Sequence, residues 1–178
     1  MGRIKMETLT YAEFKALEKN DSYYKGRWPY FNEVIRIINK ECPKSVLELG
    51  PYKNPIVKGS DVMDVNPYFP HLTYSHNAAE IPWPIEDSQY DLFIALQVWE
   101  HLNGKQSAAF KEVMRISKMA ILSFPLNWFV PGDCHNRITE DTISAWTLHT
   151  IPFKKIKVTQ KVFFFLDISK IIYFFKFR

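Results

Sequence analysis

The sequence predicts an α/β protein built on a three-layer, Rossmann-like sheet that is mostly parallel, with one antiparallel C-terminal strand in a hairpin. Short apolar runs alternate with segments of helical spacing, which is typical of parallel strands joined by crossover helices. Two of these runs, residues 45–49 and 61–65, hold an acid near the end where the chain turns. Residues 154–178 contain two β-rich runs broken at Asp167-Ile168-Ser169, as in a hairpin on the sheet edge.

The length and composition are those of one globular domain. We expect a single domain over residues 1–178, with an N-terminal helical cap over 1–43 and an α/β core over 44–178. Hydrophobic residues make up 47% of the chain and charged residues 24%, which excludes a disordered protein. The net charge of +4 is not gathered into a dense Lys/Arg cluster, so no nucleic-acid partner is expected.

Cysteine usage and hydropathy predict the compartment. Cys42 and Cys134 lie far apart and match no metal-ligand spacing, so they are expected to be free thiols in a reducing environment. Residues 1–7 lack the apolar segment of a secretory signal, and no uncharged apolar stretch is long enough to span a bilayer. We therefore expect a cytoplasmic protein without stable membrane insertion.

The N-terminal segment predicts two helices. Thr10 and Glu13 have the spacing of a capping box, and helical residues follow to about Asn20. Residues 21–28 show no clear period and are expected to form a loop. Pro29 suits the first turn of a second helix, which ends at Cys42-Pro43. Four apolar residues are spaced for one face of this helix: Phe31, Val34, Ile35 and Ile38.

The remaining elements alternate. Strands are expected at residues 45–49, 61–65, 72–75, 90–96 and 119–124, the last of them stopped by Pro125. Helices are expected over residues 105–117 and after Thr139-Glu140-Asp141-Thr142, where acids in the first turn favour a helix N-terminus. Only ten residues separate Gly50 from Asp61. A parallel crossover normally needs about a dozen residues or more, so the first crossover helix is expected to be short or missing.

Four motifs resemble those of the class I S-adenosylmethionine-dependent methyltransferases. Val46-Leu47-Glu48-Leu49-Gly50 is similar to their first motif, and Met63-Asp64-Val65 to the acidic end of their second strand. Residues 81–92 resemble the loop into their fourth strand. Residues 96–102, with residues 112–118, resemble the Glu-His segment and the helix after it. The likeness covers about residues 44–125 and implies S-adenosylmethionine as the cofactor and methyl transfer to a small-molecule acceptor, for instance a sugar or glycan hydroxyl.

The sequence departs from that family directly after Gly50. Pro51-Tyr52-Lys53-Asn54-Pro55 stands where the family usually has two more glycines, and proline removes a backbone donor. This departure favours an alternative function, that of a catalytically inactive methyltransferase-like binding or scaffolding module. A nicotinamide oxidoreductase is disfavoured, because no Gly-x-Gly-x-x-Gly follows the first strand.

Two acids at strand ends are the main cofactor-binding candidates. Glu48, beside Gly50, would act near the cofactor's ammonium group, or it would bind a local backbone amide or lysine instead. Asp64, followed by Val65, would accept both hydroxyls of a ribose, or it would cap the turn before Asn66-Pro67.

Further candidates surround these acids. Asn77-Ala78 stands where the family often places an acid and a small residue at the adenine, although a plain loop asparagine is an equal alternative. Leu96 and Gln97, at the end of the fourth strand, would line the cofactor. Arg27 would meet the cofactor carboxylate with its guanidinium fork.

Three residues are candidates for catalysis. His101 follows the fourth strand and would position the acceptor or remove its proton, unless backbone contacts alone engage it. His135 would act as a general base toward a hydroxyl acceptor, with Asp133 orienting it. The adjacent Cys134-His135 is a poor chelating pair, so no metal is expected.

The C-terminal aromatic residues predict a packing role and suggest an interface. Alternating burial in an edge hairpin explains most of the apolar residues in Phe163-Phe164-Phe165 and Tyr173-Phe174-Phe175, but it does not explain three phenylalanines in a row. Any exposed excess would suit a homodimer contact through this hairpin.

Overall fold

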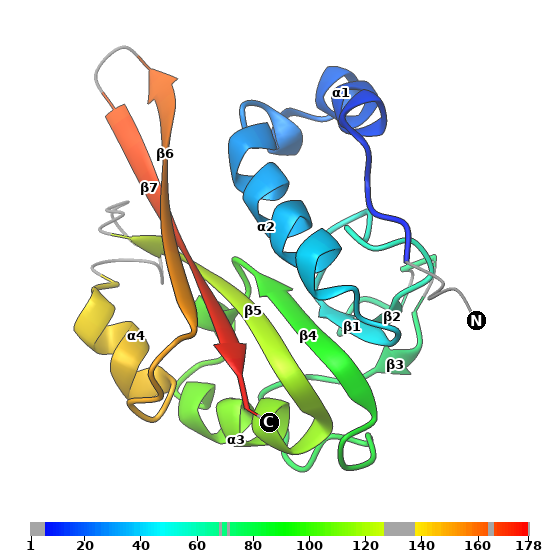
Figure 1. Ribbon diagram of the computed structural model, residues 1–178, viewed down its shortest axis with the longest axis vertical. Coiled ribbons are helices and arrows are strands. Elements are labelled where there is room, and N and C mark those ends of the chain that lie inside the picture. Colours follow the sequence, from blue (N-terminus) through cyan, green and yellow to red (C-terminus); the bar gives the residue numbers. More distant parts are fainter. Residues whose placement is uncertain (1–5, 68, 71, 127–137, 164–165, 178) are drawn as a thin grey trace.

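The computed structural model describes residues 6–67, 69–70, 72–126, 138–163 and 166–177, with the backbone alone at 160–163 and 166–168. A seven-stranded sheet forms the middle layer, with α1 and α2 on one face and α3 and α4 on the other (Figure 1). The helical elements are α1 (Tyr11–Asn20), η1 (Ser22–Tyr24), α2 (Trp28–Glu41), η2 (Trp99–His101), α3 (Gln106–Ile116) and α4 (Glu140–Trp146). The strands are β1 (Val46–Leu49), β2 (Asp61–Asp64), β3 (Tyr74–Ser75), β4 (Tyr90–Leu96), β5 (Ser117–Leu126), β6 (Lys154–Phe163) and β7 (Leu166–Lys176).

The sheet has the order β3-β2-β1-β4-β5-β7-β6. The strands from β3 to β5 pair in parallel, whereas β7 runs antiparallel to both β5 and β6. The predicted three-layer sheet with an antiparallel C-terminal hairpin is confirmed. The connection from β1 to β2, residues 50–60, is described throughout and contains no helix, so the first crossover helix is missing altogether.

The N-terminal helices form as predicted and cover one face of the sheet. The Thr10 side chain accepts the Glu13 N–H, and the Glu13 carboxylate accepts the Thr10 N–H, which completes the capping box. The apolar face of α2 packs on alternate residues of β1, β4, β5 and β7. Residues 21–28 are not only loop, because the Asp21 carboxylate accepts the Tyr23 N–H at 2.9 Å and starts the short helix η1.

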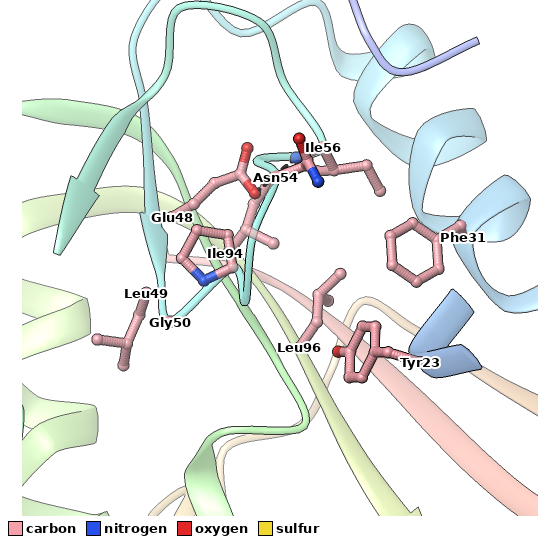
Figure 2. Close-up of a pocket in the computed structure, with 10 residues that line it drawn as sticks. Tyr23, Phe31, Glu48, Leu49, Gly50, Asn54, Ile56, Ile94 and Leu96 are labelled. Carbon is pink, nitrogen blue, oxygen red and sulfur yellow. Dashed lines mark hydrogen bonds between the residues drawn. The ribbon is translucent and has the colours of Figure 1, made fainter. Parts of the chain in front are cut away.

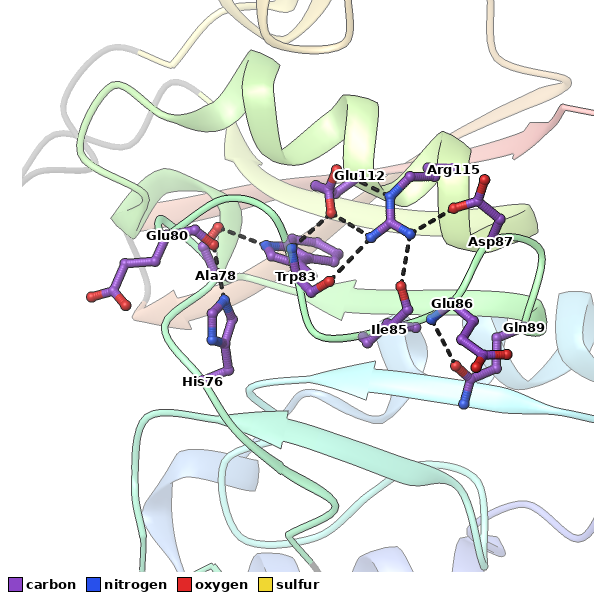
Figure 3. Close-up of polar contacts among 10 residues, drawn as sticks. All are labelled: His76, Ala78, Glu80, Trp83, Ile85, Glu86, Asp87, Gln89, Glu112 and Arg115. Atoms are coloured by element: carbon purple, nitrogen blue, oxygen red, sulfur yellow. Dashed lines mark hydrogen bonds and ion pairs between the residues drawn. The ribbon is translucent and has the colours of Figure 1, made fainter.

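The segment between β3 and β4 is fastened to α3 by polar contacts (Figure 3). The Trp83 N–H donates to Oε2 of Glu112 at 2.8 Å. Arg115 donates to the carbonyls of Trp83 and Ile85 and forms an ion pair with Glu112 at 2.6 Å. Burial acts to raise the pKa of the Glu112 carboxyl, but the hydrogen bonds from Arg115 and Trp83 lower it overall.

The prediction that Pro125 stops the fifth strand was wrong, because β5 continues to Leu126. The carbonyl of Ser123 accepts the Gln97 N–H, so the backbone polar groups of Ser123 face β4. The backbone nitrogen of Pro125, two residues further along the strand, faces the same side. The pairing of β4 with β5 ends at Leu96 and Ser123. Proline therefore removes no ladder hydrogen bond at this position.

The C-terminal aromatic residues serve the core. Tyr173, Phe174 and Phe175 are buried on the two faces of β7. Phe164 and Phe165 lie outside the described residues, and the homodimer through this hairpin stays a prediction. No helix in the described part of the chain is long and apolar enough to cross a membrane.

Candidate functional site

The carboxyl ends of β1, β2 and β4 meet at one edge of the sheet. In the parallel register Leu49 lies opposite Met63 on one side and opposite Ala95 on the other. The next residues, Gly50, Asp64 and Leu96, therefore lie level at this edge. These ends are the place where open parallel sheets bind ligands.

Gly50 is required by the backbone at the end of β1. Its φ of +57° lies in the left-handed region, and its N–H donates to the carbonyl of Met63 at 3.0 Å. A Cβ atom on this residue would lie 3.0 Å from Cγ2 of Val98, which follows β4. The turn thus brings the backbones after β1 and β4 close together, and only glycine fits without displacing Val98.

Glu48 is a buried carboxylate that organises the loop after β1. Its exposed fraction is 2%, and it accepts the N–H of Ile56 at 2.9 Å, the N–H of Val57 at 2.7 Å and the hydroxyl of Ser60 at 3.0 Å. Figure 2 shows the carboxylate directed at the loop that carries Asn54 and Ile56. Burial raises the pKa of Glu48 to about 7, and the three hydrogen bonds oppose that rise. Glu48 therefore has the local backbone partners named as the alternative to a cofactor role.

The loop after β1 closes against the N-terminal segment. The ring of Tyr52 stacks on Tyr23 with 4.0 Å between centroids, and Nζ of Lys53 lies 2.6 Å from the carboxylate of Asp21. A small cavity remains beneath the loop (Figure 2), with about 20 Å³ of room for the centres of water molecules. That space is enough for about one water and too small for a nucleoside. Its lining includes Tyr23, Phe31, Glu48, Gly50, Asn54 and Leu96.

The predicted ribose acid lies at the open part of this edge. Asp64 is half-buried, and its Oδ1 accepts the N–H of Asn66 at 2.8 Å, so it caps the turn. Among the described residues, Oδ2 of Asp64 receives no hydrogen bond. Val65 beside it is 65% exposed. One carboxylate oxygen thus holds the turn, and the other has no hydrogen-bond donor within the described part of the chain.

The residues predicted for the adenine and for the fourth strand have clear local partners. Asn77 is exposed, and its Oδ1 accepts the N–H of Ala79 at 3.0 Å. Ala78 is buried, and its carbonyl accepts the indole N–H of Trp83. Gln97 has a positive φ of 59°, and its Nε2 lies 3.3 Å from Oγ of Ser123.

The predicted catalytic residues are placed only in part. His101 is exposed at the end of η2, beside the buried Glu100. Asp133 and His135 lie outside the described residues. Arg27 is half-buried, with its guanidinium carbon 3.9 Å from the ring centroid of Tyr23, so it lies next to the lining of the small cavity.

One polar residue near this edge was missed by sequence reasoning. Lys170 on β7 is only 4% exposed, and its Nζ lies 4.7 Å from the ring centroid of Tyr30. Burial and, to a lesser extent, the charge of Arg27 lower its pKa to about 7, and Glu100 opposes both. The available signal in the sequence was a lysine directly before the apolar run that begins with Ile171 and Ile172.

No protein-family profile and no curated protein matches this chain in sequence. Solved structures do match. The N-methyltransferase NodS from Bradyrhizobium japonicum WM9, in complex with S-adenosyl-L-homocysteine, has a TM-score of 0.61 and 11% identity, covering 92% of this chain and 97% of that chain. A SAM-dependent methyltransferase from Aquifex aeolicus gives 0.54 and 11%, covering 90% and 97%. The N-terminal domain of EvdMO1, in the presence of S-adenosylhomocysteine and D-fucose, gives 0.52 and 10%, covering 83% of each chain. The chain therefore has the class I methyltransferase fold.

Proposed function

We propose that this protein binds S-adenosylmethionine across the carboxyl ends of β1, β2 and β4 and transfers the methyl group to a small-molecule acceptor. The observation that carries this proposal is the register that sets Gly50, Asp64 and Leu96 level at one edge. The fold is that of methyltransferases, which supports the same conclusion. We further propose that the reaction takes place in the cytoplasm, where the thiol of Cys42 would stay reduced.

The residues at this edge fit the cofactor where they are open to solvent. Asp64 offers Oδ2 to a ribose diol, and the exposed Val65 and Asn77 leave room beside it for the nucleoside. The small cavity beneath the loop does not fit it, so the loop of Tyr52 must move off Tyr23 before a larger group can enter. When bound, the cofactor supplies an electrophilic methyl group on a sulfonium. The protein itself aligns the acceptor and excludes water.

The acceptor is proposed to be a sugar or glycan hydroxyl. The resemblance to a domain studied with D-fucose supports this choice. His101, and His135 with Asp133, remain the proposed proton acceptors for such a hydroxyl.

A second candidate function is that of an inactive binding or scaffolding module. It is favoured by Glu48, whose two oxygens are already occupied by the loop, and by the small cavity beneath that loop. Such a module would keep the fold and would not bind the cofactor, so cofactor binding separates the two functions.

Replacing Asp64 by alanine is expected to weaken S-adenosylhomocysteine binding by about 1–3 kcal/mol, roughly five- to 150-fold, because the ribose hydroxyls lose their acceptor. Isothermal titration calorimetry measures the effect. Asp64→Asn keeps an oxygen for the Asn66 N–H and so separates the loss of the turn from the loss of the ribose contact. Glu86→Ala, an exposed acid before β4, is the control and should leave the affinity unchanged. An Asp64→Ala variant with the affinity of the wild type would refute this role.

A further inference from the structure

One lysine of the sheet has its amine buried. Lys170 of β7 lies opposite Pro125 of β5 and Val158 of β6, on the face of the sheet that α2 covers. Its exposed fraction is 4%, and within the described part of the chain Nζ has no hydrogen-bond partner. A buried amine without an acceptor is unfavourable, whether it is neutral or charged. This position therefore needs an explanation beyond packing.

The described surroundings of Lys170 include a tyrosine ring and two charged side chains. Nζ lies above the ring of Tyr30, whose hydroxyl forms a hydrogen bond with Oγ of Ser123. Arg27 is close enough for its charge to act on Lys170, and the buried Glu100 acts in the opposite direction. The titratable or charged groups around Lys170 among the described residues are Arg27, Tyr23, Tyr30 and Glu100.

Among the described residues, the charges around Lys170 do not balance. With Lys170 protonated, two cations face one described carboxylate, Glu100, in a region from which burial removes water. Burial and the Arg27 charge both favour the neutral amine, so a further negative charge nearby would stabilise the protonated form. A bound carboxylate, phosphate or sulfate would supply that charge and the missing acceptor for Nζ.

We propose that Lys170 and Arg27 hold the anionic group of the methyl acceptor, which is therefore an acidic small molecule that carries a carboxylate or a phosphate. The assignment to the acceptor rests on the proposed function and on the sheet order. Lys170 stands on β7, beyond β5, whereas the cofactor is assigned to the ends of β1, β2 and β4. Arg27 then serves the acceptor and not the cofactor carboxylate.

The test uses sulfate and acetate, whose charges stay constant between pH 6 and 8, as probes of the full chain. Carbon-13 NMR of labelled lysine follows Cε of Lys170, which Lys170→Met identifies by removing its signal. Without an anion the signal should titrate near pH 7, and saturating sulfate should raise that midpoint by at least one unit. Because the anion binds the protonated amine, sulfate affinity should fall about tenfold from pH 6 to pH 8. Sulfate that binds more tightly than acetate would favour a phosphate group, and the reverse a carboxylate.

Two variants and a second ligand complete the test. Lys170→Met should weaken sulfate binding at pH 6 at least tenfold, while Lys157→Met, an exposed lysine of the same hairpin, should leave it unchanged. The affinity for S-adenosylhomocysteine should be equal in both variants and the wild type.

A Lys170 titration midpoint that neither sulfate nor acetate shifts would overturn the anion site. Lost S-adenosylhomocysteine binding in Lys170→Met would assign the anion to the cofactor carboxylate and overturn the acceptor site. If the wild type binds no S-adenosylhomocysteine, the proposed methyl transfer and the assignment to a methyl acceptor both fail, and the sulfate titration then decides the anion site alone.

Discussion

Replacing Glu48 by alanine is expected to lower the free energy of unfolding by about 2–5 kcal/mol, because two buried backbone amides lose their acceptor. These are the N–H groups of Ile56 and Val57, which no helix holds in this connection. Urea unfolding followed by circular dichroism measures the loss. Glu86→Ala removes an exposed acid and should change the stability little. A Glu48→Ala protein as stable as the wild type would show that the loop does not depend on this carboxylate.

The charge of Glu48 also predicts a pH dependence with a definite sign. Its pKa is about 7 in the folded protein, against 4.5 for a solvated glutamate of the unfolded chain, so the folded protein binds more protons between these values. The contribution of this group to stability is therefore greatest below pH 4.5, falls as the pH rises to about 7 and is constant above that. Glu48→Gln cannot ionise, and its stability curve should lack this fall. A curve that keeps the wild-type slope would assign the slope to another group.

Replacing Arg115 by alanine should destabilise the protein by about 2–4 kcal/mol, because it leaves the buried Glu112 carboxylate without its cation. It also removes the Arg115 donor from the carbonyl of Ile85, whereas the carbonyl of Trp83 keeps the N–H of Ile85 as a donor (Figure 3). Thermal or urea unfolding measures the change. Arg36→Ala is the matched control, since Arg36 is exposed and pairs with Glu33 on the surface of α2. Equal stability of the two variants would mean that the Arg115 contacts contribute no more than a surface ion pair.

The elements that sequence reasoning placed correctly are those with local signals. The capping box of Thr10 and Glu13 and the proline at the start of α2 act within one turn of helix, so the residues involved are close in the sequence. The missing crossover helix follows from the ten residues between Gly50 and Asp61. Such features need no knowledge of the tertiary structure.

The features that sequence reasoning missed depend on distant partners. The continuation of β5 past Pro125 depends on where β4 ends, which is a matter of register between strands. The partners of Glu48 follow it by eight residues or more, along a loop without regular structure. Lys170 contacts Tyr30 of α2 and is affected by the charges of Arg27 and Glu100, all far away in the sequence. Only the assembled layers bring these groups together.

The central claim is that the ends of β1, β2 and β4 form a cofactor site, and a crystal structure grown with millimolar S-adenosylhomocysteine tests it most directly. We expect the ligand to bind at this edge, with its ribose hydroxyls donating to Asp64 and with the Tyr52 loop moved away from Tyr23. An edge without ligand, with Tyr52 still stacked on Tyr23 and no heat of binding at the same concentration, would contradict it and leave the scaffolding function in its place.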